Sequence, residues 1–111
     1  MQIRGFLRLW PLVPCFFLPV TAASADTPPE VQTLIDRYGC MSCHGLVHKQ
    51  VGPGFAQVAD RYRTDSTAAV TLASRLRTGT VGHWGRLVMP RQPRMTEAES
   101  LTLSRWVLAR P

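Results

Sequence analysis

The segment Cys40-Met41-Ser42-Cys43-His44 holds the residues most able to do chemistry in this 111-residue chain. Two cysteines three positions apart, followed at once by histidine, have the spacing that attaches a c-type haem. Each thiol can form a thioether to one vinyl group, and the histidine is delivered to one face of the iron. We therefore predict one covalent haem c, bound through Cys40 and Cys43, with His44 as the first axial ligand.

The cysteine pair has two other interpretations, a dithiol redox site and half of a zinc site. A zinc site needs a second Cys/His pair at ligand spacing, and none follows in the sequence. A thioredoxin-like site needs a βαβ setting, and the strand signal in this chain is weak. The histidine directly after the second cysteine favours haem attachment over both.

The second axial ligand must be a thioether or an imidazole from elsewhere in the chain. Met89 is favoured because it precedes Pro90 within a long irregular segment, 45 residues after His44. Met95, His83 and an open sixth position are the alternatives, since an isolated methionine is usually a packing residue. A neutral thioether favours Fe(II), and two filled axial positions suit electron transfer better than substrate binding.

The first predicted helix leads directly into the haem motif. It starts at a capping box, Thr27-Pro28-Pro29-Glu30, with threonine as the N-cap and proline at the first helical position. Val31 and Leu34 begin one apolar stripe at helical spacing. Gly39 ends this helix immediately before Cys40.

Three further helices, each with an apolar stripe, are predicted over about 55–62, over about 67–78 and from 96 to near the C-terminus. Asp65 or Ser66 is the expected cap of the middle one, and Thr96 opens a second capping box in the last. The segment from Gly79 to Met95 shows no periodicity. We expect it to be a functional loop.

The first 25 residues have the pattern of a secretory signal peptide. Arg4 and Arg8 precede an apolar stretch, and Ala23-Ser24-Ala25 has the small-X-small pattern of a cleavage site. An uncleaved anchor is the alternative, but the uncharged run of 17 residues is short and contains three prolines. We expect cleavage, export to a bacterial periplasm without stable membrane insertion, and one haem domain over residues 26–111.

Basic residues outnumber acidic ones in the expected mature chain, 11 to 7, which gives a net charge of +4 before haem carboxylates are counted. All but Lys49 are arginines, and they are scattered singly, with no basic run and no interleaved aromatic residues. This distribution argues against nucleic acid as a partner. It favours docking to an acidic protein, with ordinary surface solubility as the alternative.

Several motifs resemble, in order and spacing, the small bacterial class I cytochromes c of the cytochrome c-551 type, also called cytochrome c8. The resemblance covers residues 26–111. It rests on Gly39-Cys40-Met41-Ser42-Cys43-His44, Val51-Gly52-Pro53, Gly82-His83-Trp84-Gly85, Met89-Pro90 and Arg105-Trp106-Val107-Leu108. It implies an all-α fold with about four helices wrapped around one covalently bound haem, and we expect a monomer.

The resemblance also implies roles for single residues. His44 and Met89 are the implied iron ligands, and the Pro53 carbonyl accepts a hydrogen bond from the far ring nitrogen of His44. Trp84 and Arg75 match positions that hydrogen-bond a haem propionate. The residues matching the apolar lining of the haem crevice are Ile35, Val58, Tyr62, Leu72, Leu76, Leu103 and Val107. Trp106 is instead expected to be a core residue where the last helix packs on the first.

We therefore expect a periplasmic one-electron carrier, not an enzyme, that docks transiently with redox proteins. In the resembling family such partners include nitrite reductase, cytochrome c peroxidase and terminal oxidases. One alternative is a dedicated cytochrome subunit of a redox enzyme complex, whose chemistry would be the same. Another is a haem peroxidase or gas-binding protein with a labile sixth ligand, for which the sequence shows no distal acid–base pair.

Overall fold

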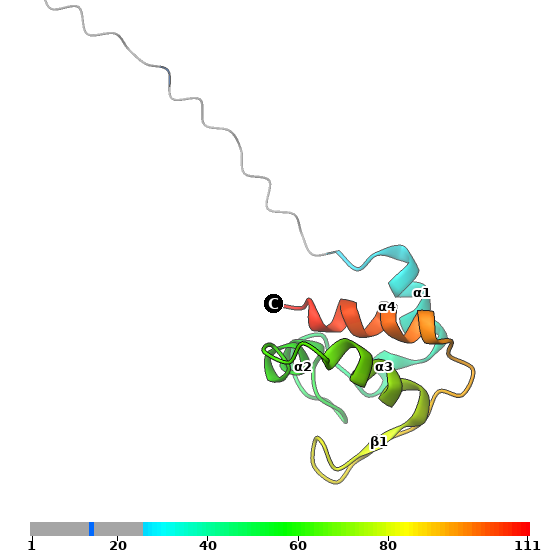
Figure 1. Cartoon of the computed structure of the whole chain (residues 1–111). Helices are drawn as coiled ribbons and strands as arrows, with labels where there is room; N and C mark the ends of the chain where they lie inside the picture. Colours follow the sequence, from blue (N-terminus) through cyan, green and yellow to red (C-terminus); the bar gives the residue numbers. More distant parts are fainter. Residues whose placement is uncertain (1–13, 15–25) are drawn as a thin grey trace, which may run out of the picture.

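The computed structural model describes residue 14 and residues 26–111 (Figure 1). The predicted signal segment, Pro14 apart, lies outside the described residues. Within the described residues, no helix combines the length and the apolar character needed to cross a membrane. The elements are α1 (Pro29–Arg37), a 3-10 turn η1 (Cys40–Ser42), α2 (Phe55–Arg61), α3 (Ala68–Thr78), β1 (Thr80–Val81), β2 (Val88–Met89) and α4 (Glu97–Leu108). The prediction of an all-α fold built on four helices is confirmed.

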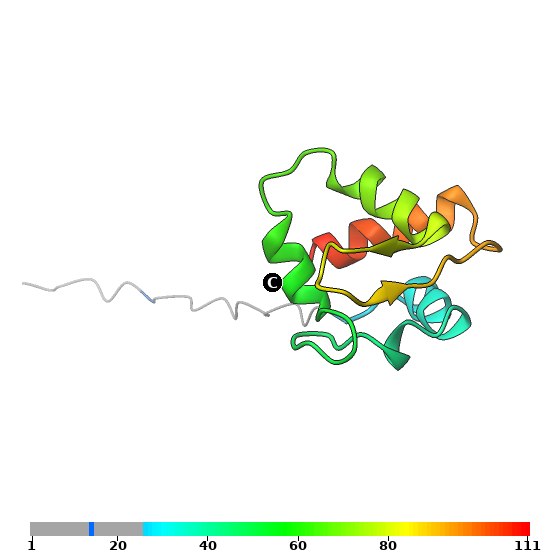
Figure 2. The same cartoon turned by 90° about the horizontal axis from the view of Figure 1, so that it is seen from below.

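Helix α4 is the centre of the packing, because it contacts each of the other three helices. Figures 1 and 2 show α1 and α3 on different sides of it. Trp106 of α4 is buried with Val31 and Leu34 of α1. Its ring meets Phe55 of α2 edge to face, with the ring centroids 5.5 Å apart. The expectation that Trp106 joins the last helix to the first is confirmed.

The two predicted capping boxes have different outcomes. Helix α1 begins at Pro29 with no side-chain cap, so the box predicted at Thr27 is wrong. Consecutive prolines fix φ near its helical value and remove an N–H that would otherwise need a partner, so this start is stable without a side-chain cap. The box at Thr96 is confirmed: its hydroxyl accepts from the Glu99 N–H at 3.1 Å, and Glu99 accepts from the Thr96 N–H at 2.9 Å.

Helix α3 begins at Ala68, with Thr67 and not Asp65 or Ser66 at its N-cap. The Asp65 carboxylate instead accepts hydrogen bonds from the backbone N–H and the hydroxyl of Thr67, at 2.8 and 2.7 Å. These bonds hold the pKa of Asp65 below its ordinary value. Gly79 ends the helix with φ of +80°, which agrees with the predicted end near residue 78.

The segment expected to be an irregular loop contains a short antiparallel ribbon. Thr80 of β1 lies opposite Met89 of β2, and Val81 lies opposite Val88. Strands of two residues are too short to produce an alternating pattern in the sequence. After β2 the chain is bound again to the end of α3, where the Gln92 N–H donates to a backbone carbonyl at 3.0 Å. Met89 is therefore held by backbone pairing on a segment that is anchored at both ends.

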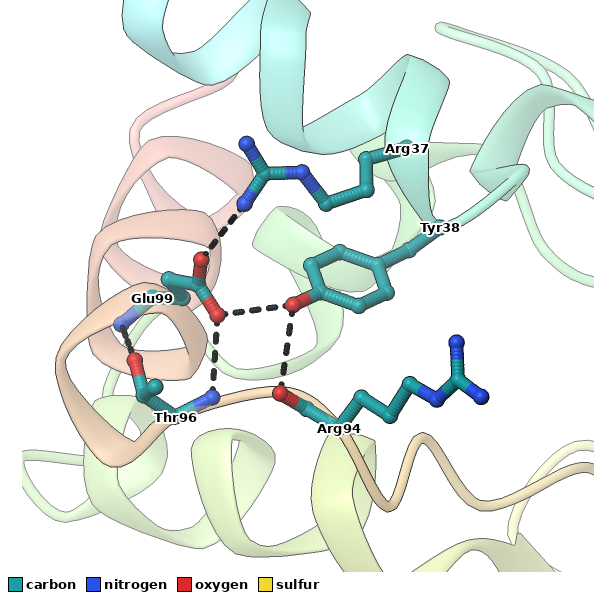
Figure 3. A network of polar contacts seen from close by, with 5 residues as sticks. All are labelled: Arg37, Tyr38, Arg94, Thr96 and Glu99. Atoms are coloured by element: carbon teal, nitrogen blue, oxygen red, sulfur yellow. Dashed lines mark hydrogen bonds and ion pairs between the residues drawn. The ribbon is translucent and has the colours of Figure 1, made fainter.

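The end of α1 is joined to the start of α4 by polar contacts centred on Glu99 (Figure 3). Its carboxylate accepts hydrogen bonds from Arg37 at 2.9 Å and from the Tyr38 hydroxyl at 2.7 Å. With the bond from the Thr96 N–H as the largest cause, these contacts hold the pKa of Glu99 below its ordinary value. The same carboxylate raises the pKa of Tyr38. The Glu99 side chain thus accepts from a backbone N–H at the start of α4 and holds the end of α1 against that helix.

Candidate haem site

A predominantly apolar cleft opens between the Cys40–His44 segment, the β1–β2 ribbon and the helices, with a volume of about 1160 Å³ counting its open mouth. Six of the seven residues expected to line a haem crevice do line it: Ile35, Val58, Leu72, Leu76, Leu103 and Val107. Tyr62 does not line the cleft. Its hydroxyl accepts a hydrogen bond from Arg75 at 2.9 Å.

The two cysteines lie on one tight turn at the edge of this cleft. Gly39 adopts φ of +64° after α1, which reverses the chain direction and starts η1. The N–H groups of Cys43 and His44 both bond to the Cys40 carbonyl, at 3.3 and 3.1 Å. Cys40 is partly buried, and burial raises the pKa of its thiol, while Cys43 is exposed. Both cysteines line the cleft that His44 also lines.

The His44 ring is oriented by the segment that follows the motif. Its Nδ1 lies 2.7 Å from the Pro53 carbonyl oxygen. Because a carbonyl can only accept, Nδ1 must carry the proton, and Nε2 of the neutral ring then has its lone pair free for a metal. Phe55 stacks on the same ring, with centroids 5.3 Å apart and planes 22° apart.

Gly52 allows this arrangement because it has no side chain. A Cβ at this position would lie 2.7 Å from Cε1 of His44. The Gly52 N–H also donates to the Cys43 carbonyl at 2.8 Å, which ties this segment to the cysteine turn. The sequence had indicated Gly52 only as part of a motif and Phe55 only as a helix residue. Their contacts with His44 come from chain folding that residue spacing does not reveal.

The three alternative sixth ligands occupy different places. Met89 is partly buried and lines the cleft with His44. Met95 is 5% exposed and packs in the core with residues of α1 and α4. His83 also lines the cleft, but its side chain is exposed near the turn of the ribbon. The structure therefore separates Met95 from the cleft and brings Met89 to it.

Arg75 and Trp84 both line the cleft. The Arg75 guanidinium is held by its bond to the Tyr62 hydroxyl. The Trp84 ring lies under a second guanidinium, with Cζ of Arg61 4.5 Å from the ring centroid. Arg61 is a residue of this region that the sequence had not indicated.

The residues present fit a haem. The cleft has apolar walls, a paired thiol turn, an imidazole with a free Nε2 and a thioether on a facing element. The donors are those of c-type haem ligation, a histidine and a methionine. Gly52 leaves space for the histidine ring in the one orientation that Pro53 supports.

Comparisons with known proteins agree with this geometry. Residues 30–110 match the family model described as Cytochrome c. Cytochrome c-552 of Hydrogenobacter thermophilus is 40% identical over 94 residues, covering 85% of this chain and 95% of that protein. Cytochrome c-551 of Azotobacter vinelandii is 43% identical over 70 residues, covering 63% and 84%. The crystal structure of Nitrosomonas europaea cytochrome c552 superposes with a TM-score of 0.68 at 30% identity, covering 72% of this chain and 99% of that one.

Proposed function

This chain belongs to the cytochrome c family, as a small class I member of the c-551 type, and on that premise we propose that it carries single electrons between redox proteins in the periplasm. Members of the family carry haem c attached through two cysteines, and Cys40 and Cys43 have the required spacing. The relatives are electron carriers and not enzymes. The periplasmic location rests on the signal-like segment 1–25 of the sequence.

The observation that carries the proposal is that His44 and Met89 line one apolar cleft. We assign them as the two axial ligands, so that no coordination position is left for a substrate. The bound haem supplies one reversible Fe(III)/Fe(II) couple. The apolar walls exclude water and disfavour the added positive charge of the oxidised state. A soft thioether favours the reduced state further.

The hydrogen bond between His44 and Pro53 has a mechanistic purpose in this proposal. It keeps the imidazole in one tautomer and one orientation, and it increases the electron-donating strength of the ligand. A ring held in this way would need little rearrangement when a bound haem gained or lost an electron. Arg75 and Trp84 would bind haem carboxylates at the polar edge of the cleft, with a guanidinium and an indole N–H as donors.

We assign electron exchange to the edge of the cleft near Cys43, where exposed apolar side chains gather around the cleft mouth. Val51, Leu87 and Val88 are exposed and also line the cleft. Small apolar contacts of this kind suit weak, short-lived complexes. The scattered arginines would attract an acidic redox partner, for which nitrite reductase, cytochrome c peroxidase and terminal oxidases are the proposed classes.

Protein-film voltammetry of the haem-loaded protein tests this function. We expect one reversible one-electron wave that stays unchanged when carbon monoxide is added, because the iron has no open position. Addition of peroxide should produce no catalytic current. A wave that shifts with carbon monoxide, or a sustained peroxide-dependent current, would show an accessible iron and overturn the assignment as a pure carrier.

A further inference from the structure

Arg61 connects the end of α2 to the turn of the β1–β2 ribbon by two contacts. Its guanidinium Cζ lies 4.5 Å from the centroid of the Trp84 ring. Its Nη1 donates a hydrogen bond to the backbone carbonyl of His83. One side chain therefore holds both the ring and the backbone of a turn that lies 22 or more residues further along the chain.

The turn has little else to fix it. Gly82 and Gly85 flank the segment that carries Trp84, with φ of +83° and +87°. A Cβ built on either glycine would meet no atom within 4 Å. Glycine has no side chain to pack against a neighbour and adopts φ of either sign, so these two positions add no side-chain contact that fixes the turn. The position of the indole therefore depends on the contacts made by the ring itself.

The charge of Arg61 is not used in an ion pair within residues 26–111. The ion pairs found there join Arg37 to Glu99 and Arg63 to Asp60. A guanidinium over an aromatic face is attracted by the electrons of the ring, and its remaining N–H groups stay available to a carbonyl. This is the geometry that Arg61 adopts with Trp84 and His83.

Arg61 is also linked, through Tyr62, to Arg75, a cationic residue that lines the cleft. Its Cζ lies 5.8 Å from the Tyr62 ring centroid, and Cζ of Arg75 lies 6.0 Å from the same centroid. Arg75 also donates to the Tyr62 hydroxyl. Trp84, Arg61, Tyr62 and Arg75 thus form one series of contacts, both ends of which line the cleft.

We propose that Arg61 is a positioning residue that holds Trp84 at the mouth of the cleft. The inference rests on the proposed function, which gives Trp84 its contact with the haem, and it adds the residue that makes this contact possible. Arg61 itself need not touch the haem. It fixes the direction of the indole N–H by clamping the turn from α2.

Hydrogen exchange of the indole N–H groups of Trp84 and Trp106 in the reduced, haem-loaded protein tests the proposal. Arg61→Ala should accelerate exchange at Trp84 by about tenfold, which is the scale expected for losing a cation–π contact and its associated hydrogen bond. Trp106, buried in the core, is the internal reference and should not change. Arg63→Ala is the matched control, because Arg63 is an exposed arginine nearby that does not contact Trp84.

Two results would overturn the proposal. One is an unchanged Trp84 exchange rate in Arg61→Ala. The other is equal acceleration at Trp84 and Trp106, which would mean general destabilisation. The sulfur-to-ferric-iron absorption band, recorded on the same protein preparations after oxidation, separates this failure from failure of the ligand assignment. A normal band together with unchanged Trp84 exchange in Arg61→Ala would contradict only the positioning role of Arg61. A wild type that lacks the band would contradict ligation by Met89.

Discussion

The His44 ring is fixed by three neighbours from one short segment. The Pro53 carbonyl accepts a hydrogen bond from Nδ1, and Phe55 stacks on the face of the ring. Gly52 has no side chain, which leaves space beside Cε1. In the proposed site the motif would place the ring next to the iron, and these later residues would determine which nitrogen faces the metal. The arrangement gives Gly52 a role that can be tested directly.

Gly52→Ala should displace the His44 ring, because the new methyl group would lie 2.7 Å from Cε1. Loss of the bond to Pro53 weakens the imidazole as a donor and should raise the reduction potential. The Nδ1 proton of His44 should also exchange faster in NMR spectra. An unchanged potential together with a protected Nδ1 proton would contradict this account.

Gly82→Ala is the control for that experiment. It also places a side chain on a glycine, and its positive φ costs backbone strain of order 1–3 kcal/mol, but no atom lies near the added methyl group. The His44 signals should therefore match those of the wild type.

Single residues differ in how far the sequence predicts them. Cys40, Cys43 and His44 lie within five consecutive residues, so their common site could be predicted from spacing alone. Met89 and Met95 lie in the same aperiodic segment, and the sequence kept both as possible ligands. The sequence favoured Met89, and the fold separates the two, since Met95 is a core residue that does not line the cleft. Contacts such as that of Arg61 with Trp84 join different elements and leave no periodic signal.

At the scale of elements, the junction of α1 with α4 depends on the ionised state of Glu99. Its pKa is lowered in the folded protein, so its contribution to stability is present above its unfolded value near 4.5 and is lost as the pH falls through the folded value. The pKa of Tyr38 is raised in the folded protein. The contribution of its neutral hydroxyl to stability is therefore present below its unfolded pKa of about 10 and is lost as the pH rises through the folded pKa. The junction should be strongest between these limits.

Glu99→Gln should lower the melting temperature at pH 7, because the carboxylate that accepts from Arg37 and Tyr38 is replaced by a neutral amide oxygen, which accepts more weakly. The difference from the wild type should shrink as the pH falls through the lowered folded-state pKa of Glu99, where the wild-type carboxylate also becomes protonated. Thermal melts of the haem-loaded proteins across this range check the prediction. A difference that is independent of pH would mean that the charge of Glu99 contributes nothing.

Trp106→Ala should be the most damaging change outside the haem ligands. The side chain is 7% exposed and packs between α4, α1 and α2. Truncation of a buried tryptophan costs about 3–5 kcal/mol of unfolding free energy. Denaturant titration of the haem-loaded protein measures this, with Val70→Ala on an exposed position of α3 as the control. A loss below about 1 kcal/mol would contradict the central position of α4.

The four helices could be predicted because each has an apolar stripe, and three of their ends have a glycine or a capping box, at Gly39, Gly79 and Thr96. The start of α1 was placed wrongly because threonine before two prolines resembles a capping box. The prolines alone are sufficient to start the helix, without a side-chain cap. The β1–β2 ribbon was missed because each strand has two residues. Its pairing depends on the end of α3 and on the anchored segment after Met89, which are tertiary features.

At the scale of the whole molecule, the expected mature chain has a net charge of +4 spread over single arginines. Such a field steers an acidic partner during encounter and is screened by salt, with a Debye length of about 10 Å at 0.1 M. The bimolecular rate of electron transfer to an acidic redox partner should therefore fall several-fold between about 0.05 and 0.5 M salt. Stopped-flow mixing measures this rate, and a flat salt dependence would remove electrostatic docking from the account.

The central claim, ligation by His44 and Met89, is tested most directly by the optical spectrum of the oxidised protein. We predict the weak long-wavelength sulfur-to-ferric-iron band in the wild type and in Met95→Leu, which alters only the methionine in the core. The band should be absent in Met89→Ala. Its absence from the wild type, or its survival in Met89→Ala, would contradict the account, because another group would then occupy the sixth position or leave it open.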